Sequence, residues 1–151
     1  MIIEPDLYVI TRGGSDDLNA FLNSNKIELG GYAKSFVSSE EFKISNSGES
    51  INIRLIGFNK DLLISEILSE IEKGGYKLPD AEDAVWFGIK YAEVQSKFPI
   101  AFLHEPWIRP ETGGENVLIL RNYGDKNYLH MHLFDSRWYS HIRFAVIEKN
   151  K

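Results

Sequence analysis

The sequence predicts a single α+β domain over residues 1–151, with a mostly antiparallel sheet, about three helices and a C-terminal third rich in strands. A chain of 151 residues with 43% hydrophobic side chains is long enough for one core. Amphipathic helical patterns are concentrated in the middle of the chain, and short β-rich runs stand before and after them. Because helices and strands are segregated more than they alternate, α+β fits better than a parallel doubly wound sheet.

The first third of the chain predicts a strand, a helix and then a stretch of turns. Residues 7–11 form a β-rich run that Gly13-Gly14 ends, and Ser15 is a good N-cap for a helix directly behind them. The apolar face of that helix consists of Leu18, Phe21 and Leu22. Glycine, serine and asparagine are frequent in residues 23–50, where we expect turns around short strands such as 41–44.

Two better-defined helices follow a half-buried strand at residues 51–55, where apolar and polar side chains alternate. The first helix spans residues 59–73, and Gly74-Gly75 supplies the left-handed stop that helix C-termini favour. Its apolar stripe consists of Leu63, Ile64, Ile67, Leu68 and Ile71. Asp80 caps the second helix, and Pro99 prevents that helix from continuing.

The last third predicts antiparallel sheet, because short β-rich segments alternate there with turn residues. The predicted strands are residues 100–103, 117–121, 128–134 and 142–148. Residues 123–127 form a good hairpin loop, and residues 104–110 form a long loop bracketed by two prolines.

Composition excludes several classes of function. The chain has no cysteine, which removes disulfides, thiolate nucleophiles, zinc ribbons and iron–sulfur clusters. A net charge of −5 without any basic run disfavours nucleic-acid binding, which needs basic surface to displace counterions from phosphates. No apolar stretch approaches the roughly 20 residues of a membrane span. We therefore expect a cytoplasmic protein that binds neither nucleic acid nor membrane and carries no cofactor.

His130 and His132 are the best metal-like pair in the chain. They lie two residues apart in a predicted strand, so both side chains project from one face, whereas Leu129, Met131 and Leu133 form the core face. A working site needs a third ligand. The candidates near in sequence are His104, Glu105, Asp135 and His141. Paired histidines on a solvent-facing strand usually hold no metal, so the structural alternative stays open.

Other catalytic patterns are weaker. No Gly-x-Ser-x-Gly motif is present, and the Gly13-Gly14-Ser15 helix start lacks the lysine of a phosphate-binding loop. Glu82 and Asp83 are adjacent on a predicted helix, so their side chains point about 100° apart and do not share a site. We expect them to be surface acids that complement the helix dipole.

Aromatic and arginine side chains in two predicted loops indicate a recognition surface. The first loop is residues 104–110, and the second is the connection before the last strand. Tryptophan, tyrosine and arginine dominate binding hot spots. The candidate binding residues are Trp107, Arg109, Arg137, Trp138 and Tyr139. The alternative is that the tryptophans fill the core beneath these loops.

The run Gly75-Tyr76-Lys77-Leu78-Pro79-Asp80-Ala81-Glu82 through Trp86-Phe87 resembles a segment of the formylglycine-generating (sulfatase-modifying factor) proteins, relatives of the C-type-lectin-like fold. That family segment reads Gly-aromatic-Arg-Leu-Pro-Thr-Glu-x-Glu-Trp. Its Thr and Glu are replaced here by Asp80 and Ala81, and Trp86 is displaced.

The closing Ser136-Arg137-Trp138 and Arg143-Phe144-Ala145-Val146 are similar to the terminal strands of such domains, and also to short uncharacterised bacterial and phage proteins. The resemblance covers at most residues 75–147. It implies a compact mixed domain whose loops present a ligand- or protein-binding face. The family's catalytic cysteines have no counterpart in this chain, so its oxidase activity does not carry over.

Two hypotheses of function follow. The first is a non-catalytic binding or interaction module that uses the aromatic and arginine loops against a protein or a small molecule. The alternative is a metal-dependent hydrolase centred on His130 and His132, with Glu105 or Asp135 as base. The chain leans toward a non-enzyme, because no convincing catalytic set is present. Self-association through a sheet face bearing Tyr128 and Phe134 stays open as well.

Overall fold

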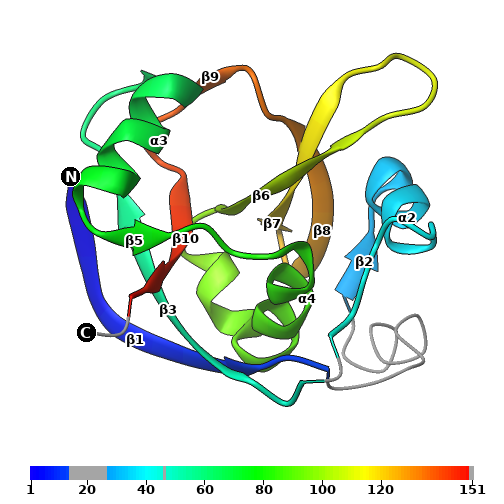
Figure 1. Ribbon diagram of the computed structural model, residues 1–151, viewed down its shortest axis with the longest axis horizontal. Helices are drawn as coiled ribbons and strands as arrows, with labels where there is room; N and C mark the ends of the chain where they lie inside the picture. Colours follow the sequence, from blue (N-terminus) through cyan, green and yellow to red (C-terminus); the bar gives the residue numbers. More distant parts are fainter. Residues whose placement is uncertain (14–26, 46, 150–151) are drawn as a thin grey trace.

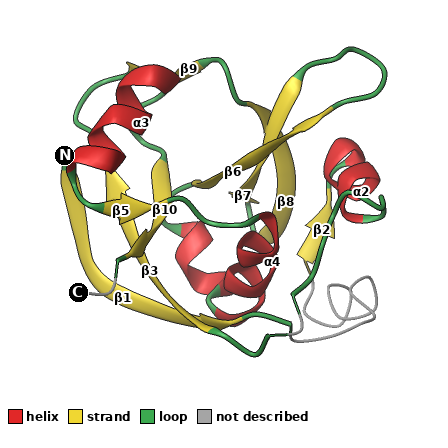
Figure 2. Ribbon diagram, in the orientation of Figure 1, coloured by secondary structure: helices red, strands yellow, loops and turns green. Residues whose placement is uncertain are grey.

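The computed structural model describes residues 1–13, 27–45 and 47–149, and it confirms the α+β class (Figures 1 and 2). Three α-helices occur in these residues: Gly31–Val37 (α2), Ile64–Lys73 (α3) and Ala81–Lys90 (α4), the last followed by a 3-10 helix at Ala92–Ser96 (η1). The strands are Ile2–Thr11 (β1), Ile27–Leu29 (β2), Ser50–Gly57 (β3), Leu62–Leu63 (β4), Tyr76–Lys77 (β5), Ile100–Ile108 (β6), Glu115–Tyr123 (β7), Lys126–Leu133 (β8), Arg137–Trp138 (β9) and Arg143–Glu148 (β10). The helix expected behind Ser15 lies outside the described residues.

One mixed sheet curves around α4 and dominates the molecule (Figure 1). Its strand order is β1-β3-β10-β6-β7-β8-β2, and β5 pairs with β10 beside this path. Neighbouring strands are antiparallel except for β10–β6 and β2–β8, which are parallel, so the expected predominance of antiparallel pairing is confirmed. The short strands β4 and β9 pair with each other apart from this sheet.

The two faces of the sheet bury separate apolar clusters. Adjacent strand residues point to opposite faces, so Phe102 packs on the side of α4 and Leu103 packs on the side of α3. On the α4 face the core includes Phe87 together with apolar side chains of α2, and on the α3 face it includes Ile67. We call these two surfaces the α4 face and the α3 face.

Helix boundaries follow local chemistry. The Asp80 backbone N–H donates to Asp83 Oδ2 over 2.9 Å, which confirms the predicted helix start and makes Asp83 its capping-box partner. Gly75 adopts φ +78°, the left-handed conformation expected after α3. Helix α3 begins at Ile64 and not at Asn59, because Leu62–Leu63 extend to pair with β9.

Three further expectations from the sequence were wrong. Residues 41–44 are irregular and form no strand, and α2 arises in a stretch where turns around short strands were expected. Strand β6 continues to Ile108 through residues that were predicted to be a loop. Between the pairs Phe102–Leu118 and Trp107–Asn116, residues 103–106 of β6 stand opposite residue 117 alone, so an irregular bulge carries the strand past Pro106.

Candidate ligand-binding cavity

A cavity of about 530 Å³ opens on the α4 face. Its walls come from α2, the irregular segment 41–45, the first turn of α4, and residues 104–107 of β6. The β6 bulge shapes this wall. Strand alternation alone would place His104 and Trp107 on opposite faces, but the odd register shift brings Trp107 into the α4-face cluster.

Three rings form a buried stack in the cavity wall. The ring centroid of Phe36 lies 5.2 Å from that of Trp107 and 5.7 Å from that of His104, and both pairs are stacked. Each of the three side chains is at least nine-tenths buried. Because Phe36 sits on the short helix α2, this stack fixes one side of the cavity entrance to the sheet.

His104 is locked in one neutral form. Its Nδ1 donates to the carbonyl of Glu105 over 2.7 Å, and its Nε2 accepts from the Leu118 backbone N–H over 2.9 Å. Burial lowers the pKa of His104 to about 4, against the Glu105 hydrogen bond and the charge of Asp80, which both favour the protonated ring. Since both ring nitrogens are occupied, His104 has no free site for proton transfer or metal binding.

Glu82 and Asp83 are not surface acids, and this expectation is corrected. Their exposed fractions are 3% and 0%. Glu82 Oε1 accepts from the Ser45 N–H over 2.9 Å, while its Oε2 accepts from Trp86 Nε1 over 2.7 Å. The burial is possible because these partners replace the hydrogen bonds of water, and Glu82 thereby ties the 41–45 segment to α4.

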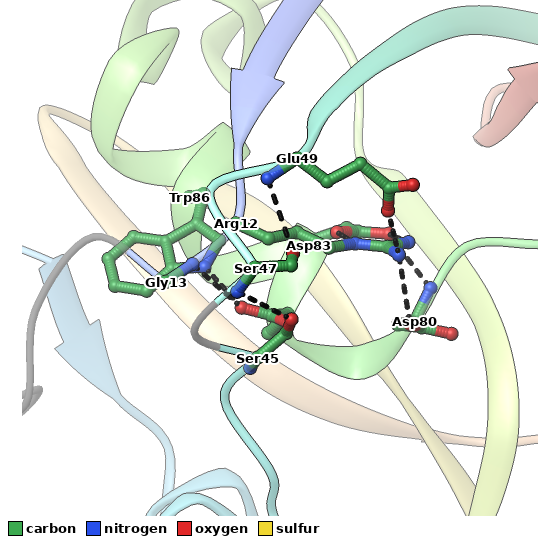
Figure 3. A network of polar contacts seen from close by, with 9 residues as sticks. Arg12, Gly13, Ser45, Ser47, Glu49, Asp80, Asp83 and Trp86 are labelled. Atoms are coloured by element: carbon green, nitrogen blue, oxygen red, sulfur yellow. Dashed lines mark hydrogen bonds and ion pairs between the residues drawn. The ribbon is translucent and has the colours of Figure 1, made fainter.

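Asp83 forms a bidentate ion pair with Arg12 at the end of β1 (Figure 3). Arg12 Nε and Nη2 donate to the two Asp83 oxygens over 2.9 and 2.8 Å, while Arg12 Nη1 lies 3.1 Å from Glu49 and 3.3 Å from Asp80. Burial raises the pKa of Asp83, and the hydrogen bonds from Arg12 and the Asp80 N–H oppose that rise. This network joins β1, the chain before β3 and α4 behind the cavity.

The cavity lining is acidic. It contains the carboxylates of Glu41, Asp80, Glu82 and Glu105 and one ammonium group, that of Lys43. The carboxylates of Glu82 and Asp80 have the partners given above. In the part of the chain that the structure describes, neither the Glu41 nor the Glu105 carboxylate has a hydrogen bond or ion pair, and both residues are exposed. Two exposed carboxylates without a partner among the described residues therefore line the same cavity as the aromatic wall.

The structure separates the five candidate loop residues. Trp107 is 5% exposed on the α4 face, and Trp138 is 1% exposed in the α3-face cluster, where its Nε1 donates to the Phe134 carbonyl over 3.2 Å. Both tryptophans thus fill core positions, although Trp107 also lines the cavity. Arg137 and Tyr139 are exposed on the short connection that includes β9.

Arg109 connects the β6–β7 loop to α2. Its guanidinium carbon lies 3.4 Å from the Tyr32 ring centroid, and its Nε lies 3.4 Å from Glu111 Oε2. Arg109 is therefore engaged within the protein and does not line the cavity.

His130 and His132 share one face of β8, as predicted. His132 stacks on Trp138 at 4.2 Å and its Nδ1 donates to the Leu133 carbonyl over 2.9 Å, whereas His130 packs against Gly30. Burial, with a smaller contribution from the charge of Arg121, lowers the pKa of both histidines. Over residues 1–13, 27–45 and 47–149, no group of three or more His, Asp or Glu side chains is placed to hold a metal ion. Leu133, expected in the core, is 57% exposed at the end of the strand.

No protein family model, curated protein or solved structure matches the chain. Within the described residues, no helix is long and apolar enough to cross a membrane. Sequence patterns pointed to His104, Glu105 and Trp107 but missed Phe36, Glu41 and Lys43, because residues 31–45 carry turn residues and no clear period. The sequence did hold one signal that Asp83 has a structural role. Asp83 lies three residues after the helix cap Asp80, where a carboxylate can accept a hydrogen bond from the backbone N–H of the cap.

Proposed function

We propose that the protein is a non-catalytic binding module that receives a cationic group in the α4-face cavity. The observation that carries this proposal is the pair of unpartnered carboxylates, Glu41 and Glu105, beside a buried aromatic wall in a cavity of about 530 Å³. Ligand cavities have this size and combine apolar walls with few polar groups. The ligand is a small molecule or a side chain that carries an amine or a guanidinium.

Binding is favoured over catalysis because the groups suited to proton transfer are already engaged. Both nitrogens of His104 and both oxygens of Glu82 are held in hydrogen bonds within the protein. A general acid or base must reach the reacting proton of a substrate. The remaining carboxylates are exposed, and exposed carboxylates attract cations without the burial that tunes them for catalysis.

Calorimetric titration with agmatine, which carries an amine and a guanidinium, tests this proposal, with neutral N-butylurea as the control ligand. We expect agmatine to bind and Glu105→Gln and Glu41→Gln each to weaken binding about tenfold, because each removes a charge-assisted hydrogen bond. Glu93→Gln, which makes the same change outside the cavity, is the matched control. Equal affinities for agmatine in all three variants and the wild-type protein would overturn the proposal.

The other expectations from the sequence remain predictions. They are the resemblance to the C-type-lectin-like and sulfatase-modifying-factor group, the cytoplasmic location, self-association, and the hydrolase alternative at His130 and His132. The hydrolase alternative requires that zinc, nickel or manganese stabilise the purified protein, which thermal melting measures directly.

A further inference from the structure

A second cavity, of about 270 Å³, lies where β6 begins and β7 ends. Residues 95–99, which run from the end of η1 to the start of β6, form one wall, residues 121–123 form another, and His141 contributes from the loop before β10. This cavity shares no lining residue with the acidic one. Gln95 is 2% exposed and joins the walls, because its Nε2 donates to the carbonyl of Arg121 over 2.6 Å.

The lining of this cavity has the opposite charge. Lys97 and Arg121 are its two charged residues, and no Asp or Glu lines it, although the chain as a whole carries a net charge of −5. A concave surface of one sign concentrates ions of the other sign. The second cavity therefore favours an anion.

Arg121 is the decisive residue. Four other arginines pair with carboxylates in the described part of the chain: Arg12, Arg54, Arg109 and Arg143. Arg137 is exposed to water. Arg121 is half-buried, yet its guanidinium has no hydrogen bond or ion pair among the described residues. A guanidinium without an acceptor from the protein keeps its planar set of donors free for a ligand.

We propose that this second cavity binds a phosphoryl oxyanion, either as free phosphate or as the phosphate group of a small ester. The guanidinium of Arg121 fits two phosphate oxygens at once, and the ammonium of Lys97 adds a flexible point charge. This inference is independent of the function proposed for the acidic cavity, because the two sites differ in residues and in charge.

Amide chemical shifts, followed by NMR at constant ionic strength, test the proposal with inorganic phosphate and methyl phosphate as probes. We expect saturable shifts at residues 95–98, 121–123 and 141, and the tighter of the two probes identifies the free ion or the ester as the occupant. Shifts produced equally by chloride, or spread over exposed lysines, would overturn the proposal, because they indicate screening without a site.

Variants sharpen this test. Arg121→Gln is expected to weaken phosphate binding about tenfold or more, Arg121→Lys to weaken it less, and Lys34→Gln, which removes one exposed charge outside the cavity, to leave it unchanged. Lys97→Gln provides a second disruption at an exposed position with no partner to lose, so it guards against misfolding of the Arg121 variants. Unchanged affinity in both Arg121→Gln and Lys97→Gln would contradict the assignment.

Discussion

The two faces of the sheet bury similar apolar side chains but differ in their polar groups. Every buried polar or charged residue of the described chain belongs to α4, to η1 or to a strand position on the α4 face: Glu82, Asp83, Gln95, His104 and Asn116. The α3 face is lined by apolar side chains, and the indole N–H of Trp138 is satisfied by a backbone carbonyl. The α3 face therefore has an almost wholly apolar interior, whereas the α4 face, where we propose that a ligand binds, also buries polar groups in defined positions.

Breaking the Arg12–Asp83 pair is expected to have the largest effect. Arg12→Ala leaves the fully buried Asp83 carboxylate without its partner, and we expect the free energy of unfolding to fall by about 3–5 kcal/mol in urea titrations. Arg54→Ala removes a pairing to the more exposed Glu148 and should cost only about 1 kcal/mol or less. Equal costs for the two variants would contradict the special position of the α4 face.

Truncating a buried side chain of the α3 face should also lower the free energy of unfolding, but without removing a charge. Ile67 is fully buried in α3, and Ile67→Ala is expected to lower the free energy of unfolding by about 2–5 kcal/mol through lost burial and a residual cavity. Since the variant removes only apolar atoms, the loss should stay constant between pH 4 and 7, measured by urea unfolding at several pH values. A loss that varied with pH would show that Ile67 is coupled to a titrating side chain such as His132, which stacks on Trp138 of this cluster.

His104 should make the α4 face sensitive to acid. Its pKa of about 4 in the folded protein lies below the unfolded value of 6.5, so the unfolded state binds more protons in this window and stability falls as pH drops from 6.5 to 4. The loss is complete below pH 4 and amounts to about 3 kcal/mol. His104→Gln should unfold more easily at pH 7 but show a flatter pH dependence. A dependence as steep as in the wild-type protein would assign the acid sensitivity to other groups.

Local and long-range features differ in how far the sequence predicts them. The Gly75 stop and the Asp80 cap are local patterns, and the structure confirms both. Of the predicted apolar stripe, residues 64, 67, 68 and 71 pack into the α3-face cluster, whereas Leu63 precedes α3 and is 48% exposed. The pairing of Arg12 with Asp83 spans 71 residues and leaves no periodic trace. Trp107 reaches the cavity only because an irregular bulge shifts β6, and no local propensity encodes that shift.

The smallest effect on stability is expected for Arg109→Ala. This variant tests whether the β6–β7 loop takes part in the proposed binding. Its stacking on Tyr32 holds the loop against α2, and a partly exposed cation–π contact contributes about 0.5–1 kcal/mol. We expect Arg109→Ala to lower the free energy of unfolding by that amount and to leave agmatine affinity unchanged, because its side chain does not line the cavity. Calorimetry and urea unfolding on the same variant give both numbers. Unchanged stability with lost affinity would instead move recognition from the cavity to the loop, where the sequence first placed it.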